Sequence, residues 1–213
     1  MPLKINEIYY SVQGESTHAG RPCIFIRLTY CNLRCTYCDT EYAFYDGEDM
    51  ENVDIMKKIH HWDCNLVEVT GGEPLFQEEC IDLLKKLVSS NYEVMLETGG
   101  SLSISDVPNE VIKIVDFKCP SSAMEKKNLW SIVDNLQPHD EVKFVIGNRE
   151  DFDWAKGKIT KYSLDKICTL LFSPTFGAID PQQIVEWILA ENLPVRIQMQ
   201  MHKMIWSPDK QGV

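Results

Sequence analysis

Three cysteines lie within eight residues of the chain, at Cys31, Cys35 and Cys38, with the spacing C-x3-C-x2-C. Thiolates are good ligands for zinc, copper(I) and iron–sulfur clusters. A structural zinc site normally takes four nitrogen or sulfur ligands. No second cysteine pair is present, and His18 and the pair His60–His61 are possible further ligands. Iron–sulfur clusters normally take four cysteines, so a three-cysteine loop indicates a cluster with one iron open to a non-protein ligand.

The bulk composition is that of an ordinary globular protein. The chain has 213 residues, 44 % of them hydrophobic and 25 % charged, which suits one domain over residues 1–213. The net charge of −11 disfavours binding to nucleic acid, because phosphate backbones are repelled. The start has no signal-peptide core and no apolar run reaches membrane-spanning length, so we expect a cytoplasmic protein without membrane contact. We expect reduced, buried thiols rather than disulfides at the scattered cysteines, Cys23, Cys64, Cys80, Cys119 and Cys168.

Strand and helix patterns alternate along the chain. Residues 5–15 indicate a short extended segment that runs into a loop. Apolar and β-branched runs predict strands at 23–30, 66–70, 93–97, 111–117, 141–146, 167–172 and 195–199. Helical spacing predicts helices at 54–62, 77–90, 124–136, 150–161 and 181–192. This alternation predicts an α/β fold with a parallel sheet.

Gly, Pro, Ser or Cys residues follow several of these strands, as at the C-terminal rim of β/α barrels. Six or seven parallel strands are too few for a closed eight-stranded barrel. We therefore predict a partial, open TIM-like β/α barrel. A doubly wound, flavodoxin-like sheet is the structural alternative.

A second motif, Gly71-Gly72-Glu73-Pro74, follows the predicted strand at 66–70. By itself it could equally be a turn at the end of a strand, but two glycines also let backbone carbonyls approach a ligand closely. Together with the cysteine loop, the motif resembles the radical S-adenosylmethionine (SAM) superfamily. The resemblance implies a [4Fe–4S] cluster on Cys31, Cys35 and Cys38. It also implies SAM bound to the open iron, and chemistry carried by the cofactor radical rather than by a catalytic side chain.

Further stretches narrow this resemblance: residues 11–16, 25–28, 37–43, 117–122, 173–177 and 200–206. Over essentially its whole length the chain resembles the 7-carboxy-7-deazaguanine synthase family. This implies a lyase that converts 6-carboxy-5,6,7,8-tetrahydropterin to 7-carboxy-7-deazaguanine with loss of ammonia, in the biosynthesis of queuosine-type 7-deazapurines. It also implies Mg²⁺, a homodimer and a flavodoxin-type electron donor.

The same resemblance implies roles for individual residues. The expected SAM contacts are Tyr37, Cys38, Asp39, Gly72, Lys118, Cys119, Pro120, Ser173, Pro174, Thr175 and Phe176. The expected substrate contacts are Val12, Gln13, Gly14, Glu15, Arg27, Thr70 and Val213. The substrate would thus be held in part by the N-terminal segment 1–22 and the C-terminal tail 200–213. Thr40 is the expected Mg²⁺ ligand.

Two of these roles, those of Arg27 and Thr40, have simpler competitors. Glu15 would accept hydrogen bonds from the guanidine-like edge of the pterin, and Arg27 would pair bidentately with its carboxylate. The competing interpretation of Arg27 is a salt bridge at the rim. For Thr40 it is a hydroxyl that caps the following turn. Two residues depart from the family pattern: Tyr30, where a small residue is usual, and Gly99, where Asn is common.

Two alternative functions remain open at this point. One is another radical SAM enzyme, such as a glycyl-radical-enzyme activase, which acts on a protein. The other is a zinc-binding interaction module without catalysis.

Overall fold

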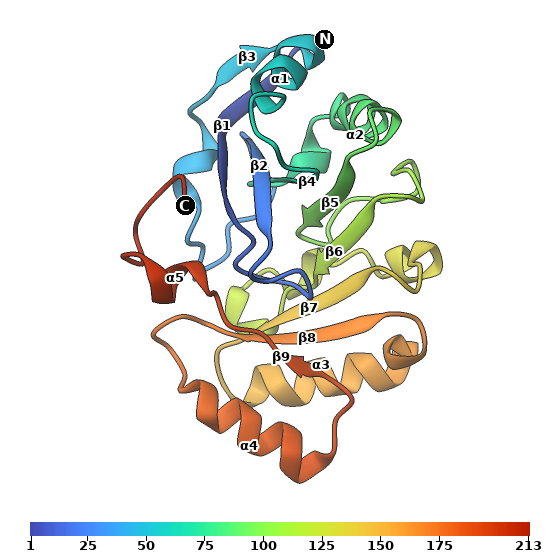
Figure 1. Cartoon of the computed structure of the whole chain (residues 1–213). Coiled ribbons are helices and arrows are strands. Elements are labelled where there is room, and N and C mark those ends of the chain that lie inside the picture. Colours follow the sequence, from blue (N-terminus) through green and yellow to red (C-terminus); the bar gives the residue numbers. More distant parts are fainter.

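The computed structural model describes residues 1–213 and contains one nine-stranded sheet in the order β3-β1-β2-β4-β5-β6-β7-β8-β9. The strands are β1 (Leu3–Val12), β2 (Pro22–Leu28), β3 (Glu48–Met50), β4 (Leu66–Gly71), β5 (Glu93–Thr98), β6 (Ile112–Asp116), β7 (Glu141–Ile146), β8 (Thr169–Pro174) and β9 (Arg196–Ile197). Seven strands, β2 and β4 to β9, are parallel, and β1 lies antiparallel between β2 and β3. The end strands β3 and β9 do not pair with each other. The predicted open partial barrel is confirmed (Figure 1).

Four helices cover the outer face of the curved sheet (Figure 1). They are α1 (Asn52–Ile59), α2 (Cys80–Ser89), α3 (Arg149–Tyr162) and α4 (Pro181–Glu191). A fifth, α5 (His202–Ile205), is one turn long and belongs to the C-terminal segment. Short 3₁₀ turns complete the chain: η1 (Glu41–Phe44), η2 (Pro74–Phe76), η3 (Pro120–Ser122), η4 (Glu125–Lys127), η5 (Trp130–Asn135) and η6 (Leu164–Lys166).

Alternation along the strands divides the apolar residues between two cores. On β2, for example, Ile24, Ile26 and Leu28 join the main core of 34 buried residues beneath the helices. The opposite face of the sheet carries a small apolar cluster of Cys23, Phe25, Leu66, Met95 and Ile114. This second cluster fills one end of the inner, concave face and leaves the other end for polar side chains.

The predicted helix at 124–136 is wrong, because tertiary contacts hold this segment in 3₁₀ turns. The side chain of Asn128 bonds both backbone groups of Lys118, at 2.9 Å each. The ring of Trp130 stacks on Phe117 and on Tyr162, with centroids 4.5 Å apart in both pairs. A regular helix could not satisfy these contacts together.

The two ends of the sheet also differ from the prediction. β1 is a ten-residue strand where only a short extended piece was expected, because it pairs along most of β2. The last strand was predicted at 195–199 and is only two residues long. No helix is both long and apolar enough to span a membrane.

Candidate active site

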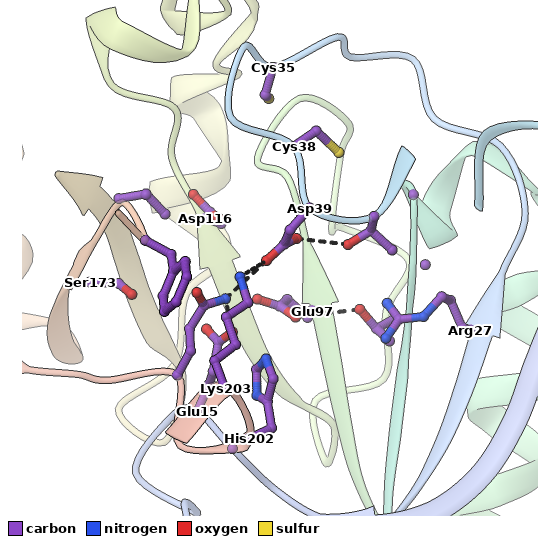
Figure 2. A pocket seen from close by; sticks show the side chains of 18 of the residues that line it. Glu15, Arg27, Cys35, Cys38, Asp39, Glu97, Asp116, Ser173, His202 and Lys203 are labelled. Atoms are coloured by element: carbon purple, nitrogen blue, oxygen red, sulfur yellow. Dashed lines mark hydrogen bonds and ion pairs between the residues drawn. The ribbon is translucent and has the colours of Figure 1, made fainter. Parts of the chain in front are cut away.

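A cavity of about 730 Å³ opens on the concave face of the sheet. Its walls come from the inner residues of the strands, the cysteine loop after β2, and the C-terminal segment. Figure 2 shows Cys35 and Cys38 at one end of the cavity and Glu15 and His202 at the other, with Asp39 and Lys203 between them. The fold therefore brings the two predicted parts of the site, for cofactor and for substrate, into one space.

The cysteine loop begins with a strained residue. Tyr30 has a φ of 77°, a left-handed conformation that is rare for a residue with a large side chain. Its NH bonds the carbonyl of Ala43 at 2.9 Å, and its own carbonyl accepts from the NH of Glu73 at 2.8 Å. The sharp turn at Tyr30 thus ends β2 and leads directly into Cys31.

Cys31, Cys35 and Cys38 are all half-buried and line the cavity. Burial raises the pKa of Cys35 to about 11, and it also raises the pKa values of Cys31 and Cys38. The free thiols are therefore protonated at neutral pH, and a metal must displace their protons to bind. No group of three or more His, Cys, Asp or Glu side chains converges so that it could hold a single metal ion. Three thiolates at separate corners suit an iron–sulfur cluster better than one zinc ion.

The Gly-Gly-Glu-Pro turn packs against the start of the cysteine loop. A Cβ atom on Gly72 would lie 2.3 Å from the carbonyl oxygen of Tyr30 and 2.7 Å from Cβ of Cys31. Glu73 is fully buried and accepts hydrogen bonds from the NH of Gly99 at 2.7 Å and from the hydroxyl of Thr98 at 2.8 Å. The motif therefore joins the ends of β4 and β5 to the first cysteine.

Three buried polar atoms in residues of the cavity wall have no hydrogen-bond partner. They are the hydroxyl of Tyr37, Oδ1 of Asp116 and the hydroxyl of Thr175. Buried polar atoms without partners are rare in native structures, so each one calls for an explanation, such as a catalytic role or a bound water or ion. These two hydroxyls and one carboxylate oxygen belong to residues in the wall of the cavity that the cysteines also line, so the lining fits a polar cofactor such as SAM.

A network of charges occupies the substrate end. Nζ of Lys143 lies 3.0 Å from Oε2 of Glu15 and 3.6 Å from Oδ2 of Asp116, and it is also bonded to Glu97. Glu15 further accepts hydrogen bonds from the amides of Gln198, at 2.6 Å, and Gln200, at 3.0 Å. Burial alone would raise the pKa of Glu15, but the attraction of Lys143 outweighs it and holds the pKa below its ordinary value.

Arg27 lines the cavity and also forms an ion pair. Its Nε donates to Oε1 of Glu7 at 2.7 Å, and its Nη2 donates to the hydroxyl of Tyr9 at 3.1 Å. The salt bridge considered from the sequence is therefore present. Both hydrogens of Nη1 and one of Nη2 have no protein partner, so the outer edge of the guanidinium remains able to bind a carboxylate.

Thr40 lies in the cavity wall next to Asp39. Its hydroxyl donates to Oδ1 of Asp39 at 2.9 Å and makes no capping bond to the turn that follows. The competing role, a cap of this turn by its side chain, is not what the structure shows. Lys203 lies 2.6 Å from the other oxygen of Asp39, and its attraction outweighs the effect of burial and lowers the pKa of Asp39.

The N-terminal loop and the C-terminal segment close the open side of the barrel. The NH of Met201 bonds the carbonyl of Gly14 at 2.9 Å, and the NH of Ser16 bonds the side chain of Gln198 at 2.8 Å. His202 packs so closely on Gly14 that a Cβ there would lie 2.3 Å from its Nδ1. Residues 208–213, including the terminal Val213, contribute to the cavity wall.

Most of the residues singled out from the sequence meet in this cavity. All expected substrate residues line it, as do the three cysteines, Thr40 and most expected SAM contacts. Cys119 and Pro120 do not. The Cys119 side chain is fully buried in the main core, and Pro120 begins the turn η3, so the geometry adds no support to their predicted contacts.

Sequence reasoning missed several charged or polar wall residues: Glu68, Glu97, Asp116, Lys143, Gln200, His202 and Lys203. Four of them lie within or at the end of apolar strands, on the face that points into the barrel. A charged residue inside an otherwise apolar strand was the available signal, because a buried charge needs a partner or a function.

Comparisons with known proteins agree with this geometry. The family model described as Radical SAM superfamily matches residues 25–116. A curated 7-carboxy-7-deazaguanine synthase from Koribacter versatilis is 42 % identical over 226 residues, which cover 99 % of this chain and 100 % of the relative. Another from Chlorobaculum tepidum is 43 % identical over 215 residues, which cover 100 % of this chain and 98 % of the relative.

Two solved structures share the fold. The crystal structure of QueE from Escherichia coli matches with a TM-score of 0.80 and 23 % identity, over 95 % of both chains. Streptococcus suis SuiB bound to S-adenosylmethionine matches with a TM-score of 0.51 and 11 % identity, over 79 % of this chain and 44 % of that chain.

The family match and the curated relatives, together with the three-cysteine loop and the partial barrel, define a radical SAM enzyme, a class that uses a [4Fe–4S] cluster and SAM. Within this class, the chain belongs to the 7-carboxy-7-deazaguanine synthase family, because relatives more than 40 % identical match it from end to end. Neither alternative, the activase or the zinc module, is favoured by these matches.

Proposed function

We propose that this protein converts 6-carboxy-5,6,7,8-tetrahydropterin to 7-carboxy-7-deazaguanine with loss of ammonia, in the biosynthesis of queuosine-type 7-deazapurines. The observation that carries the proposal is the single cavity that joins the three cysteines to a polar substrate end. End-to-end similarity to curated 7-carboxy-7-deazaguanine synthases supports it. When bound, the cluster and SAM supply reductive cleavage of the sulfonium and abstraction of a hydrogen atom from the substrate.

The residues of the chain divide this work between the two ends of the cavity. Cys31, Cys35 and Cys38 hold the cluster. The remaining cofactor-end residues, Tyr37, Asp39, Gly72, Lys118 and Ser173 to Phe176, hold SAM. The support for this division is that polar atoms of Tyr37 and Thr175 are buried without partners.

At the other end, Gln13, Glu15, Arg27 and Thr70 surround the substrate, together with Val12, Gly14 and the terminal Val213. The free edge of the Arg27 guanidinium binds the substrate carboxylate. Segments 1–22 and 200–213 exclude water, because they close the open side of the barrel. Glu15 accepts hydrogen bonds from Lys143, Gln198 and Gln200, which orders these segments. Its Oε1 has only one of these partners, so it can also accept a hydrogen bond from the guanidine-like edge of the pterin.

Thr40 is the protein ligand that we propose for Mg²⁺. Its hydroxyl lies in the cavity wall and donates a hydrogen bond to the neighbouring Asp39, which leaves the oxygen lone pairs available to a metal ion. One hydroxyl suffices because Mg²⁺ keeps several waters and shares ligands with its substrate. The ion would orient the substrate carboxylate, as a template and a Lewis acid.

Two partner assignments complete the proposal: a flavodoxin-type electron donor and a second copy of the chain. Exposed apolar side chains support the homodimer, because they gather at the β9 edge of the sheet and on α5. They are Ile197, Met199, Met204 and Ile205. Sedimentation of the holoenzyme tests this assignment, and a monomer at micromolar concentration would contradict it.

The function is tested by anaerobic reconstitution, followed by turnover with the carboxypterin as the sole substrate. We expect 5′-deoxyadenosine, ammonia and 7-carboxy-7-deazaguanine to form, and Mg²⁺ to accelerate all three relative to a chelator. An activase would form 5′-deoxyadenosine only with its protein partner. No product from the carboxypterin alone would overturn the proposal.

A further inference from the structure

Among the carboxylates of the substrate end, Glu68 is the one without a cation beside it. Glu15 and Glu97 both bond Lys143. Glu68 is 4 % exposed, and its one hydrogen bond is to the side-chain amide of Gln13. A buried carboxyl without a positive partner is costly to ionise, so this group needs an explanation.

The register of the sheet places Glu68 on the inner face at the base of the cavity. It pairs with Phe25 on β2 and Met95 on β5, which belong to the small apolar cluster. Thr70 and Gly72 follow on the same face, toward the cysteines, because alternate residues of a strand point the same way. β4 therefore presents Glu68 below the two residues that we assign to substrate and to SAM.

The contacts of Gln13 determine which oxygen of Glu68 is free. The NH of Glu15 donates to Oε1 of Gln13 at 3.0 Å. A backbone NH can only donate, so the Nε2 of Gln13 must face Glu68, and it donates to Oε2 of that residue. Oε1 of Glu68 has no protein partner, and the residue lines the cavity.

The surroundings keep this carboxyl protonated near neutral pH. Burial raises the pKa of Glu68 to about 8, and the negative charges of Glu97 and Glu15 act in the same direction. The hydrogen bond from Gln13 and the positive charge of Lys143 oppose them without cancelling them. Because Oε2 already accepts a bond, the proton belongs on Oε1.

We propose that Glu68 is a substrate-recognition residue, which as a neutral acid donates its Oε1 hydrogen to the carbonyl oxygen of the pyrimidinone ring of the pterin. An ionised carboxylate could not make this bond. Glu68 would then distinguish a ring that presents a carbonyl acceptor at this edge from one that presents an amino donor. The inference rests on the function proposed above.

The other titratable groups that face this part of the cavity are held by burial or by ion pairs. Burial raises the pKa of Tyr9 on β1 to about 12 and raises the pKa of Cys23 on β2 even further. Lys143 on β7 has three acidic neighbours, which hold its pKa well above the ordinary value despite burial. Burial lowers the pKa of His202 on α5. The pKa of Glu15 in the N-terminal loop lies below its ordinary value, and Glu97 on β5 bonds the cation of Lys143.

The test is equilibrium binding of the carboxypterin to the reconstituted, SAM-loaded holoenzyme without reductant, between pH 6.5 and 9.5. For the wild type we expect Kd to rise about tenfold above pH 8, as the donated proton is lost. Glu68→Gln keeps a neutral donor, so its Kd at pH 7 stays near the wild-type value and does not rise. Glu68→Met has no donor and raises Kd about tenfold at every pH.

Glu93→Gln is the matched control, because Glu93 lies on the neighbouring strand, outside the cavity, and pairs with Arg21. It should bind like the wild type. Cluster absorbance and SAM affinity report whether each variant is folded. If Glu68→Met fails these checks, the inference is tested by whether the Kd of Glu68→Gln lacks the rise with pH that is expected of the wild type.

The outcomes separate the inference from the function on which it rests. If the wild type neither binds the carboxypterin nor forms 5′-deoxyadenosine with it, the proposed function fails and the inference fails with it. If the wild type binds and turns over, but Glu68→Gln and wild type share one pH profile, the inference alone is overturned. Wild-type affinity in a folded Glu68→Met variant would overturn it as well.

Discussion

Two residues of this site adopt energetically unfavourable states: one in its backbone conformation and one in the burial of its carboxyl group. Tyr30 adopts a left-handed backbone so that β2 can end directly at the first cysteine. Glu68 is buried without a cation, at the base of the cavity. Residues kept in costly states cluster at functional sites, where the surrounding structure holds them in place. Both residues therefore yield predictions about stability as well as function.

Glu68→Gln should change how stability depends on pH. The pKa of Glu68 is about 8 in the folded protein and near 4.5 when unfolded, so the folded state binds the extra proton between these values. The wild type then loses stability as pH rises through this window. The Glu68→Gln variant has no carboxyl group at this position, so it does not lose stability in this way. Urea unfolding should find it more stable relative to wild type at pH 8.5 than at pH 5, by a few kcal/mol, since one pKa unit corresponds to about 1.4 kcal/mol. An equal difference at both pH values would contradict the raised pKa.

Substitutions at Tyr30 should reveal its backbone strain. Glycine adopts a positive φ freely, whereas a β-branched residue there is strongly disfavoured. Tyr30→Val should therefore be less stable than Tyr30→Gly by about 1 kcal/mol or more in thermal or urea unfolding. Equal stability of the two variants would show that the left-handed turn before Cys31 is absent in solution.

At the scale of elements, the sequence predicts those features that depend only on residues close together in the chain. The cysteine loop and the Gly-Gly-Glu-Pro turn are contiguous in the chain, and both could be assigned to strand ends from sequence alone. The segment 124–136 could not, because Asn128 and Trp130 are held by residues from other elements. Its apolar residues at helical spacing predicted a helix, and tertiary contacts overrode that preference.

Asn128→Ala tests this explanation. The variant loses both hydrogen bonds to the backbone of Lys118, and one partially buried donor and acceptor are left unpaired. We expect a loss of about 1–3 kcal/mol in the free energy of unfolding. Asn135→Ala is the matched control, since its one hydrogen bond, at 3.4 Å, lies at the surface. This control should change stability by less than about 0.5 kcal/mol. Similar losses in the two variants would mean that Asn128 does not hold the segment.

At the scale of the whole molecule, the site depends on segments that lie far apart in the sequence. Glu15, Lys143 and Gln198 meet because the barrel is open and the two ends of the chain fill its gap. Such contacts depend on the register of nine strands, which residue patterns do not specify. The open barrel and the cysteine loop at the end of β2 were predictable from residue patterns, whereas the charged network around Lys143 was not.

The most direct test of the central claim compares the wild type with Cys35→Ala under anaerobic conditions, with SAM, reductant and the carboxypterin. The account predicts that the wild type forms 7-carboxy-7-deazaguanine and ammonia in equal amounts. It predicts that the variant loses the iron–sulfur absorbance and product formation together, because the cavity joins the cluster to the substrate. Product formation by a variant without the cluster would contradict the account.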